Sequence, residues 1–128
     1  MILDSSAIVS VFFQEPGYEG VLDKLQQATQ LGISGPTMVE CGIVISARLN
    51  QDARALLARF LGEFNIAIIP FTEDHYTLAL GAWLKYGKGR HPARLNFGDC
   101  LSYAASKYAN EPLLFVGEDF SKTDLSPT

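Results

Sequence analysis

The sequence has few cysteines, no long hydrophobic run and no excess of positive charge, and each absence excludes a class of protein. Its two cysteines, Cys41 and Cys100, are too few for a disulfide framework and lack the spacing of a zinc finger. The longest strongly apolar stretch, residues 66–71, is far shorter than the roughly 20 residues of a membrane-spanning helix. No basic leader precedes Ile2 and Leu3, so no signal peptide is predicted. We therefore expect a cytoplasmic protein whose two cysteines are free, buried thiols.

The charge balance also argues against one mode of binding. With a net charge of −4, the chain is not expected to hold nucleic acid through bulk positive charge. The charges are unevenly distributed, however, because residues 81–98 contain no acidic residue. Basic side chains gather there, and they can follow a phosphate backbone or form a solvated loop. They are Lys85, Lys88, Arg90, His91 and Arg94.

The composition suits a domain with a substantial hydrophobic core. Hydrophobic residues make up 48% of the 128 residues, and a chain of this length buries about two thirds of its unfolded surface. Short strand-like runs alternate with stretches of helical spacing, a pattern typical of an α/β fold with a mainly parallel sheet. We predict a three-layer α/β/α sandwich that forms one domain over residues 1–128.

The predicted elements alternate along the chain. Strands are predicted at residues 2–3, 31–34, 66–69 and 113–116, and helices at residues 5–13, 17–28, 38–49, 53–64, 74–86 and 97–108. Residues 66–69 are apolar and mostly β-branched, which favours a buried parallel strand. Thr37, Asp52 and Asn96 are predicted to cap the helices that follow them.

Two acidic residues follow predicted strands. Asp4 comes directly after the first strand, where burying an ionised carboxylate is costly unless it is hydrogen-bonded, paired or bound to a cation. Functional groups in parallel sheets collect beyond the carboxyl ends of the strands, and Asp119 follows the last strand in the same way. Each also has a structural explanation: Asp4 can cap the next helix, and Asp119 can be an ordinary turn residue.

Two further acids lie in the first turns of predicted helices. Glu40 can complete a capping box with Thr37. Asp99 lies opposite the apolar stripe of its helix, on the side of Ser102 and Ser106, and this phase favours a solvent-exposed acid near the positive helix end.

The positions of the four acids are informative together. Asp4, Glu40, Asp99 and Asp119 are all predicted at the same rim of the sandwich, where their charges would repel one another. A divalent cation relieves that repulsion, and a site made only of oxygen ligands suits Mg²⁺ or Mn²⁺.

The acids and the basic loop lie in five segments that together extend over nearly the whole chain. They are Ile2-Leu3-Asp4-Ser5-Ser6, Thr37-Met38-Val39-Glu40, Gly87-Lys88-Gly89-Arg90-His91-Pro92-Ala93, Leu95-Asn96-Phe97-Gly98-Asp99-Cys100 and Gly117-Glu118-Asp119-Phe120. In combination they resemble the PIN-domain ribonucleases, and within them the VapC toxins of toxin–antitoxin pairs. One departure is Glu118, since many relatives have asparagine there.

The resemblance implies a fold, a chemistry and partners. It implies a PIN-like α/β/α sandwich in which Asp4, Glu40, Asp99 and Asp119 form an acidic cluster, with Asp4 and Asp99 as direct metal ligands. The expected activity is Mg²⁺-dependent hydrolysis of RNA, with Lys88, Arg90, His91 and Arg94 on the substrate. It also implies a homodimer and a cognate antitoxin that covers the active-site groove.

Three other functions compete with this hypothesis. A metal-free nuclease would use His75 and His91 as acid and base, but nothing in the sequence places them together. A phosphoacceptor signalling domain needs an aspartate after the middle strand, where this chain has Pro70-Phe71-Thr72. A PIN-like binding module without strong catalysis is the remaining alternative, and the presence of all four acids argues against it.

Overall fold

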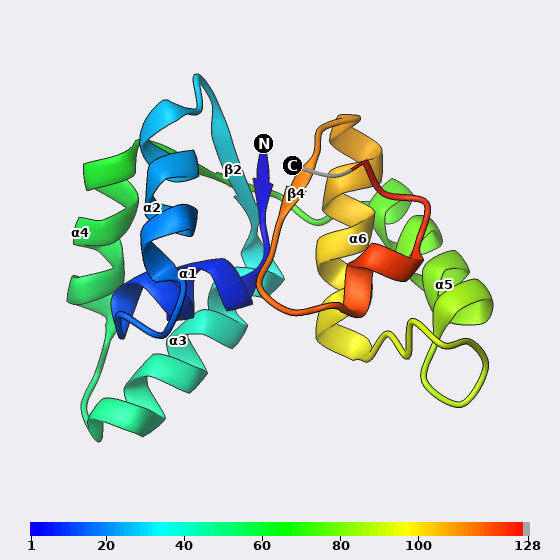
Figure 1. The fold of residues 1–128 in the computed structure, drawn as a ribbon, viewed down its shortest axis with the longest axis horizontal. Helices are drawn as coiled ribbons and strands as arrows, with labels where there is room; N and C mark the ends of the chain where they lie inside the picture. The colour runs from blue at the N-terminus through cyan, green and yellow to red at the C-terminus, as the bar shows by residue number, and fades with distance from the viewer. Residues whose placement is uncertain (127–128) are drawn as a thin grey trace.

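A four-stranded sheet lies at the centre of the molecule, between two groups of helices. The computed structural model describes residues 1–126, and its sheet is parallel throughout, in the order β3-β2-β1-β4. Helices α1 to α4 cover one face and α5 and α6 the other (Figure 1). The strands are β1 (Ile2–Leu3), β2 (Leu31–Ser34), β3 (Ile66–Ile69) and β4 (Leu113–Leu114). This is the predicted three-layer α/β/α arrangement.

The helices agree with the predicted ones to within a few residues. They are α1 (Ser5–Phe12), α2 (Tyr18–Gln27), α3 (Gly35–Leu49), α4 (Arg54–Phe64), α5 (Glu73–Tyr86), α6 (Phe97–Ala109) and the short 3₁₀ helix η1 (Asp119–Lys122). No helix within residues 1–126 is both long and apolar enough to cross a membrane.

The last strand is shorter than predicted. It ends at Leu114 instead of Val116, because the backbone N–H of Val116 donates to the hydroxyl of Ser6 (2.9 Å) instead of to a neighbouring strand. Gly117 then turns the chain with a φ of 105°, a backbone conformation that glycine adopts readily.

The start of α3 also differs from the prediction. Ser34, not Thr37, is the N-cap: its hydroxyl accepts the backbone N–H of Thr37 at 3.1 Å and bonds the Thr37 hydroxyl at 2.7 Å. Thr37 therefore lies inside the helix, and the predicted capping box with Glu40 is wrong. At α4 the cap position is Ala53, although the Asp52 carboxylate still accepts the backbone N–H of Arg54 at 2.9 Å.

The prediction of a buried third strand is also wrong. β3 is an edge strand, and Ile68 is 54% exposed although its neighbour Ile66 is buried. An apolar run predicts a strand but does not tell an edge strand from a central one, because that depends on which elements cover it.

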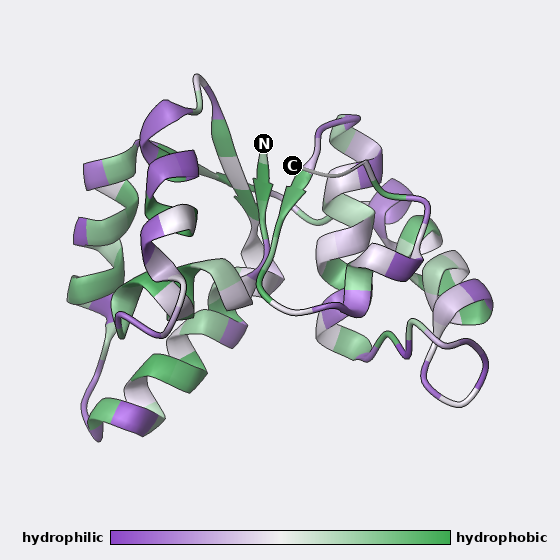
Figure 2. Ribbon diagram, in the orientation of Figure 1, coloured by the Kyte–Doolittle hydropathy of each residue, from purple (hydrophilic) through white to green (hydrophobic). Residues whose placement is uncertain are grey.

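The core lies on both faces of the sheet, and successive strand residues alternate between them. Leu3 and Leu114 pack into the cluster beneath α1 to α4, while Ile2 and Leu113 pack into the cluster beneath α5 and α6. The β1 and β4 strands are accordingly hydrophobic along their length, as their green colour in Figure 2 shows. Cys41 belongs to the first cluster and Cys100 to the second, and both are free buried thiols, as predicted.

The topology marks one position in the sheet for a site. From β1 the chain adds β2 and β3 on one side, and it then returns to place β4 on the other side of β1. Ligand sites in parallel sheets lie beyond the carboxyl ends of the strands at such a change of direction. Asp4 follows β1 there, and the segment that contains Asp119 follows β4.

Candidate active site

Asp4 is a buried carboxylate held by uncharged donors. It is 5% exposed, and its Oδ2 accepts the backbone N–H of Ser6 at 3.1 Å and the Ser6 hydroxyl at 2.6 Å. Its Oδ1 accepts the hydroxyl of Ser102 at 2.5 Å. Asp4 therefore does cap α1, as the structural explanation proposed. Since no lysine, arginine or histidine within residues 1–126 forms an ion pair with it, its negative charge has no cationic partner there.

Asp99 is buried as well, contrary to the prediction from helix phase. It is 9% exposed, and Ser102 and Ser106 on the same side of α6 are 1% and 2% exposed. The reason is that α6 packs between the sheet and α5, so that residues 98–106 are all buried. The Asp99 carboxylate accepts the backbone N–H of Asn96 at 3.0 Å, and the Asn96 side chain accepts the N–H of Asp99 at 2.9 Å. This reciprocal capping box holds Asp99 at the amino end of α6.

The raised pKa of Asp99 indicates that the other three predicted acids lie near it. Burial raises the pKa of Asp99 to about 6, although the hydrogen bond from Asn96 acts to lower it. The negative charges of Asp4, Asp119 and Glu40 also raise this pKa, so each of these three carboxylates is close enough to act on Asp99.

The thiol of Cys41, on α3, also lies close to two of the acids. Burial raises the pKa of its thiol to about 12, and the charges of Asp4 and Glu40 contribute to the shift. Cys41 is therefore a protonated core residue at neutral pH, not a nucleophile or a metal ligand.

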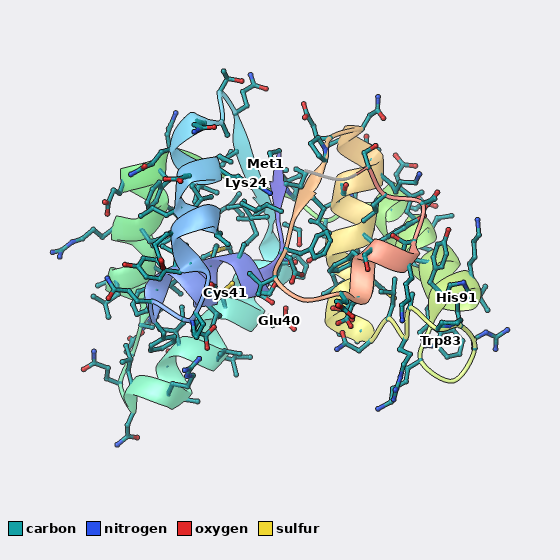
Figure 3. The ribbon with its side chains drawn as sticks, viewed as in Figure 1. Met1, Lys24, Glu40, Cys41, Trp83 and His91 are labelled. Carbon is teal, nitrogen blue, oxygen red and sulfur yellow. The ribbon has the colours of Figure 1, made fainter. Side chains whose placement is uncertain are left out.

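Glu40 reaches the site from α3 and lies against the first turn of α6. In Figure 3 it projects from α3 toward the space between the two groups of helices. Its carboxylate packs on Gly98: a Cβ built there would lie 3.0 Å from Glu40 Cδ and closer still to Oε2. Only glycine leaves room for Glu40 in this position. This role of Gly98 was not predicted from the sequence, although a glycine in the first turn of a helix was the available signal.

Asp119 is the most exposed of the four acids. It begins η1 and is exposed, as is its neighbour Glu118. The chain that leads to it is anchored near Asp4, because Ser6 donates its hydroxyl to Asp4 and accepts the N–H of Val116. Ser6 thus joins the end of β1 to the segment after β4.

The basic side chains predicted to contact the substrate belong to the loop between α5 and α6 and form no part of the acidic cluster. Lys88 and Arg94 are exposed, and the Arg90 guanidinium lies 5.0 Å from the centre of the Trp83 ring while donating to the Leu84 carbonyl at 3.1 Å. The loop that carries them projects beyond the end of α5, across α6 from α1 and α3 (Figure 1). Within residues 1–126, no ion pair joins these cations to the four acids.

The two histidines are held separately. His91 Nδ1 accepts the backbone N–H of Ala93 at 3.0 Å, and His91 lies far from Glu40 in Figure 3. His75 is buried in the first turn of α5, where its Nδ1 accepts the backbone N–H of Thr72 at 3.1 Å. The 14-residue helix α5, about 20 Å long, separates the two. They cannot act as an acid–base pair on one phosphate.

The acids fit a divalent cation by their chemistry. Asp4 and Asp99 offer carboxylate oxygens, the ligands that Mg²⁺ and Mn²⁺ prefer, in a region of uncompensated negative charge. In the part of the chain that the structure describes, no three side chains of the His, Cys, Asp and Glu types are already placed as a metal site. Binding an ion would therefore require side-chain adjustment at the rim, which the exposed Asp119 and half-buried Glu40 allow.

Comparison with known proteins relates this geometry to one family. The PIN domain family model matches residues 1–125. Ribonuclease VapC36 of Mycobacterium tuberculosis is 43% identical over 126 residues, which cover 98% of this chain and 91% of the relative. Ribonuclease VapC42 of the same species is 37% identical over 128 residues, covering 99% and 98%.

Solved structures share the fold at low sequence identity. The crystal structure of Mycobacterium tuberculosis VapC20, described as a Sarcin-Ricin loop cleaving toxin, superimposes with a TM-score of 0.77 at 16% identity, covering 99% of this chain and 97% of that one. A toxin-antitoxin complex from Klebsiella pneumoniae gives a TM-score of 0.71 at 18% identity, covering 96% and 92%. At these identities the superpositions show the fold alone.

Proposed function

The chain belongs to the PIN-domain family, and on that premise we propose that it is a Mg²⁺-dependent endoribonuclease that acts as the toxin of a toxin–antitoxin pair. The observation that carries the proposal is the acidic cluster: Asp4 and Asp99 are buried without a cationic partner within residues 1–126, close to Glu40 and Asp119. Such a cluster is costly to the fold and is explained by a bound cation. The curated relatives that bear the name ribonuclease support RNA as the substrate.

Each acid has a separate task in this proposal. Asp4 and Asp99 would hold the ion, because they are the two buried members of the acidic cluster and their hydrogen bonds fix their positions. When bound, Mg²⁺ would neutralise charge on the scissile phosphate and activate a water for in-line attack. Glu40 and Asp119 have greater freedom at the rim, and we assign them to orienting that water and accepting its proton.

The basic loop would bind RNA beyond the scissile bond. The loop that carries Lys88, Arg90, His91 and Arg94 lies across α6 from α3, the helix of Glu40, which suits contacts to the phosphates of neighbouring nucleotides (Figure 1). The solved toxin–antitoxin complex with the same fold supports a cognate antitoxin as a partner, and we propose a second copy of the chain as another. With RNA as its substrate, we propose that the protein acts in the cytoplasm.

Product analysis tests the proposed chemistry. Attack by water should leave a 5′-phosphate and a 3′-hydroxyl, since the RNA 2′-hydroxyl is not the nucleophile. The purified protein would be incubated with labelled RNA and Mg²⁺, and the fragment ends would be identified by phosphatase and ligation reactions. A 2′,3′-cyclic phosphate would contradict the proposal, and so would an absence of cleavage on every RNA tested.

Gly98→Ala should impair activity without unfolding the protein. The added methyl group would displace the Glu40 carboxylate, and we expect cleavage to fall roughly 10- to 100-fold, as a misplaced catalytic group commonly does. The gain in helix propensity, about 1 kcal/mol, should largely offset the clash in the free energy of unfolding. Cleavage rates and thermal unfolding would be measured together.

Gly62→Ala is the matched control, because a Cβ on this α4 glycine has nothing within 4 Å. It should leave cleavage unchanged and raise stability slightly. Equal cleavage rates in the two variants would show that the position of Glu40 does not matter.

A further inference from the structure

Ser102 connects α6 to the most deeply placed acid of the site. It lies 98 positions from Asp4 in the sequence, yet its hydroxyl donates to Asp4 Oδ1 at 2.5 Å. Both side chains are buried, at 1% and 5% exposure. A bond of this length from a hydroxyl to an ionised carboxylate is among the strong hydrogen bonds of proteins.

The hydrogen bonds of Asp4 leave little freedom to its carboxylate. An ionised carboxylate has about four lone-pair positions. Ser6 occupies two of them, both on Oδ2, through its backbone N–H and its hydroxyl. Ser102 occupies a third, on Oδ1. The remaining position is therefore on Oδ1, the oxygen to which Ser102 donates.

The burial of Ser102 does not by itself explain this bond. A serine inside a helix can satisfy its hydroxyl on the carbonyl one turn earlier. Ser106, one turn further along α6 and equally buried, donates to a different backbone carbonyl, that of Glu111, at 2.6 Å. Ser102 instead uses the carboxylate of the candidate site.

We propose that Ser102 is a positioning residue that orients Asp4 Oδ1 toward the divalent cation. The inference rests on the proposed metal site and adds a residue to it. Hydrogen bonds that orient metal ligands commonly change metal affinity or activity by about 10- to 100-fold when they are removed. Because Ser102 is buried, it does not contact RNA, and its effect should appear in cation binding and in kcat but not in the KM for RNA.

The test compares Ser102→Ala with Ser106→Ala by calorimetric titration of Mn²⁺ into the full-length protein. Each variant removes one satisfied, buried hydroxyl from α6, so both should lose similar stability in thermal unfolding. We expect Ser102→Ala to bind Mn²⁺ about 10- to 100-fold more weakly and Ser106→Ala to bind it within twofold of the original protein. Equal affinities in the two variants would overturn the assignment.

A second variant and the unmodified protein distinguish a failure of the role of Ser102 from a failure of the proposed function. Ser102→Cys is the substitute test if Ser102→Ala fails to fold. Its side chain fills nearly the same space with a weaker donor, so this variant should bind Mn²⁺ several-fold more weakly than the original protein. Unchanged affinity in Ser102→Cys would also overturn the assignment. If the unmodified protein binds Mn²⁺ but the Ser102 variants bind it equally well, only the role of Ser102 fails. If the unmodified protein binds neither Mn²⁺ nor Mg²⁺, the proposed function fails with it.

Discussion

Replacing Asp4 with asparagine should reduce RNA cleavage by about 1000-fold while the protein stays folded. The substitution removes the charge of a predicted metal ligand, and the loss of about 4 kcal/mol of transition-state stabilisation corresponds to that factor. Asparagine has nearly the same size, and its carbonyl oxygen can still accept the backbone N–H of Ser6, so the cap of α1 should persist. Cleavage would be measured at saturating Mg²⁺.

Asp52→Asn is the matched control for this experiment. It also removes one negative charge. Asp52 is exposed, however, and it pairs with Arg54 at 2.8 Å, not with any member of the acidic cluster. We expect its cleavage rate to stay within twofold of the original. Thermal unfolding should show no loss of stability in Asp4→Asn, because the substitution removes a buried charge that has no cationic partner in the described part of the chain. Full activity in Asp4→Asn would refute the role assigned to Asp4.

Removing divalent cations should abolish cleavage. In excess EDTA we expect the rate to fall at least about 100-fold, because the charge neutralisation and the activated water both depend on the ion. Adding Mg²⁺ or Mn²⁺ beyond the chelator should restore the rate, which serves as the control for damage by EDTA. Full activity in EDTA would exclude the metal-dependent mechanism.

Removing divalent cations should also change how the stability of the protein depends on pH. The folded-state pKa of Asp99 is about 6, above the value of about 4 expected in the unfolded chain. The folded, metal-free protein therefore binds this proton more tightly. The contribution to the free energy of unfolding is fully present below pH 4 and is lost as the pH rises through 6.

Cation binding should oppose that loss of stability. Mg²⁺ at 100 times its dissociation constant would stabilise the fold by about 2.7 kcal/mol at pH values where Asp99 is ionised. Thermal unfolding from pH 4 to pH 8, with and without Mg²⁺, would measure the effect. The same Mg²⁺ response in Asp99→Asn would show that Asp99 does not bind the ion.

The acids themselves could be found from the sequence because their positions relative to the elements are local features. Asp4 follows an apolar strand and precedes a helix, and Asn96 precedes a first turn that contains Asp99. Hydrophobic periodicity and capping preferences depend on neighbouring residues, so they predicted most elements to within a few positions. The placement of the acids at a common rim followed from the rule that parallel strands share their carboxyl edge.

Helix phase failed where tertiary packing decides burial. It predicted a solvent-exposed side of α6 with Asp99, Ser102 and Ser106, but that side is covered. A pattern of polar residues cannot report which element packs against them. Two of these polar groups are buried because partners far away in the sequence or across a turn satisfy them: Asp4 for Ser102 and the Glu111 carbonyl for Ser106.

The strand–helix order, the prediction that four acids share one rim and the likeness to one family could therefore be read from local features of the sequence. Tertiary packing set how those acids are held. It decided that Ser34 caps α3 in place of Thr37, that Gly98 leaves room for Glu40, and that Ser102 donates to Asp4. The physical reason is one of range: capping and periodicity act over a few residues, whereas a close approach or a hydrogen bond between β1 and α6 depends on how the whole chain packs.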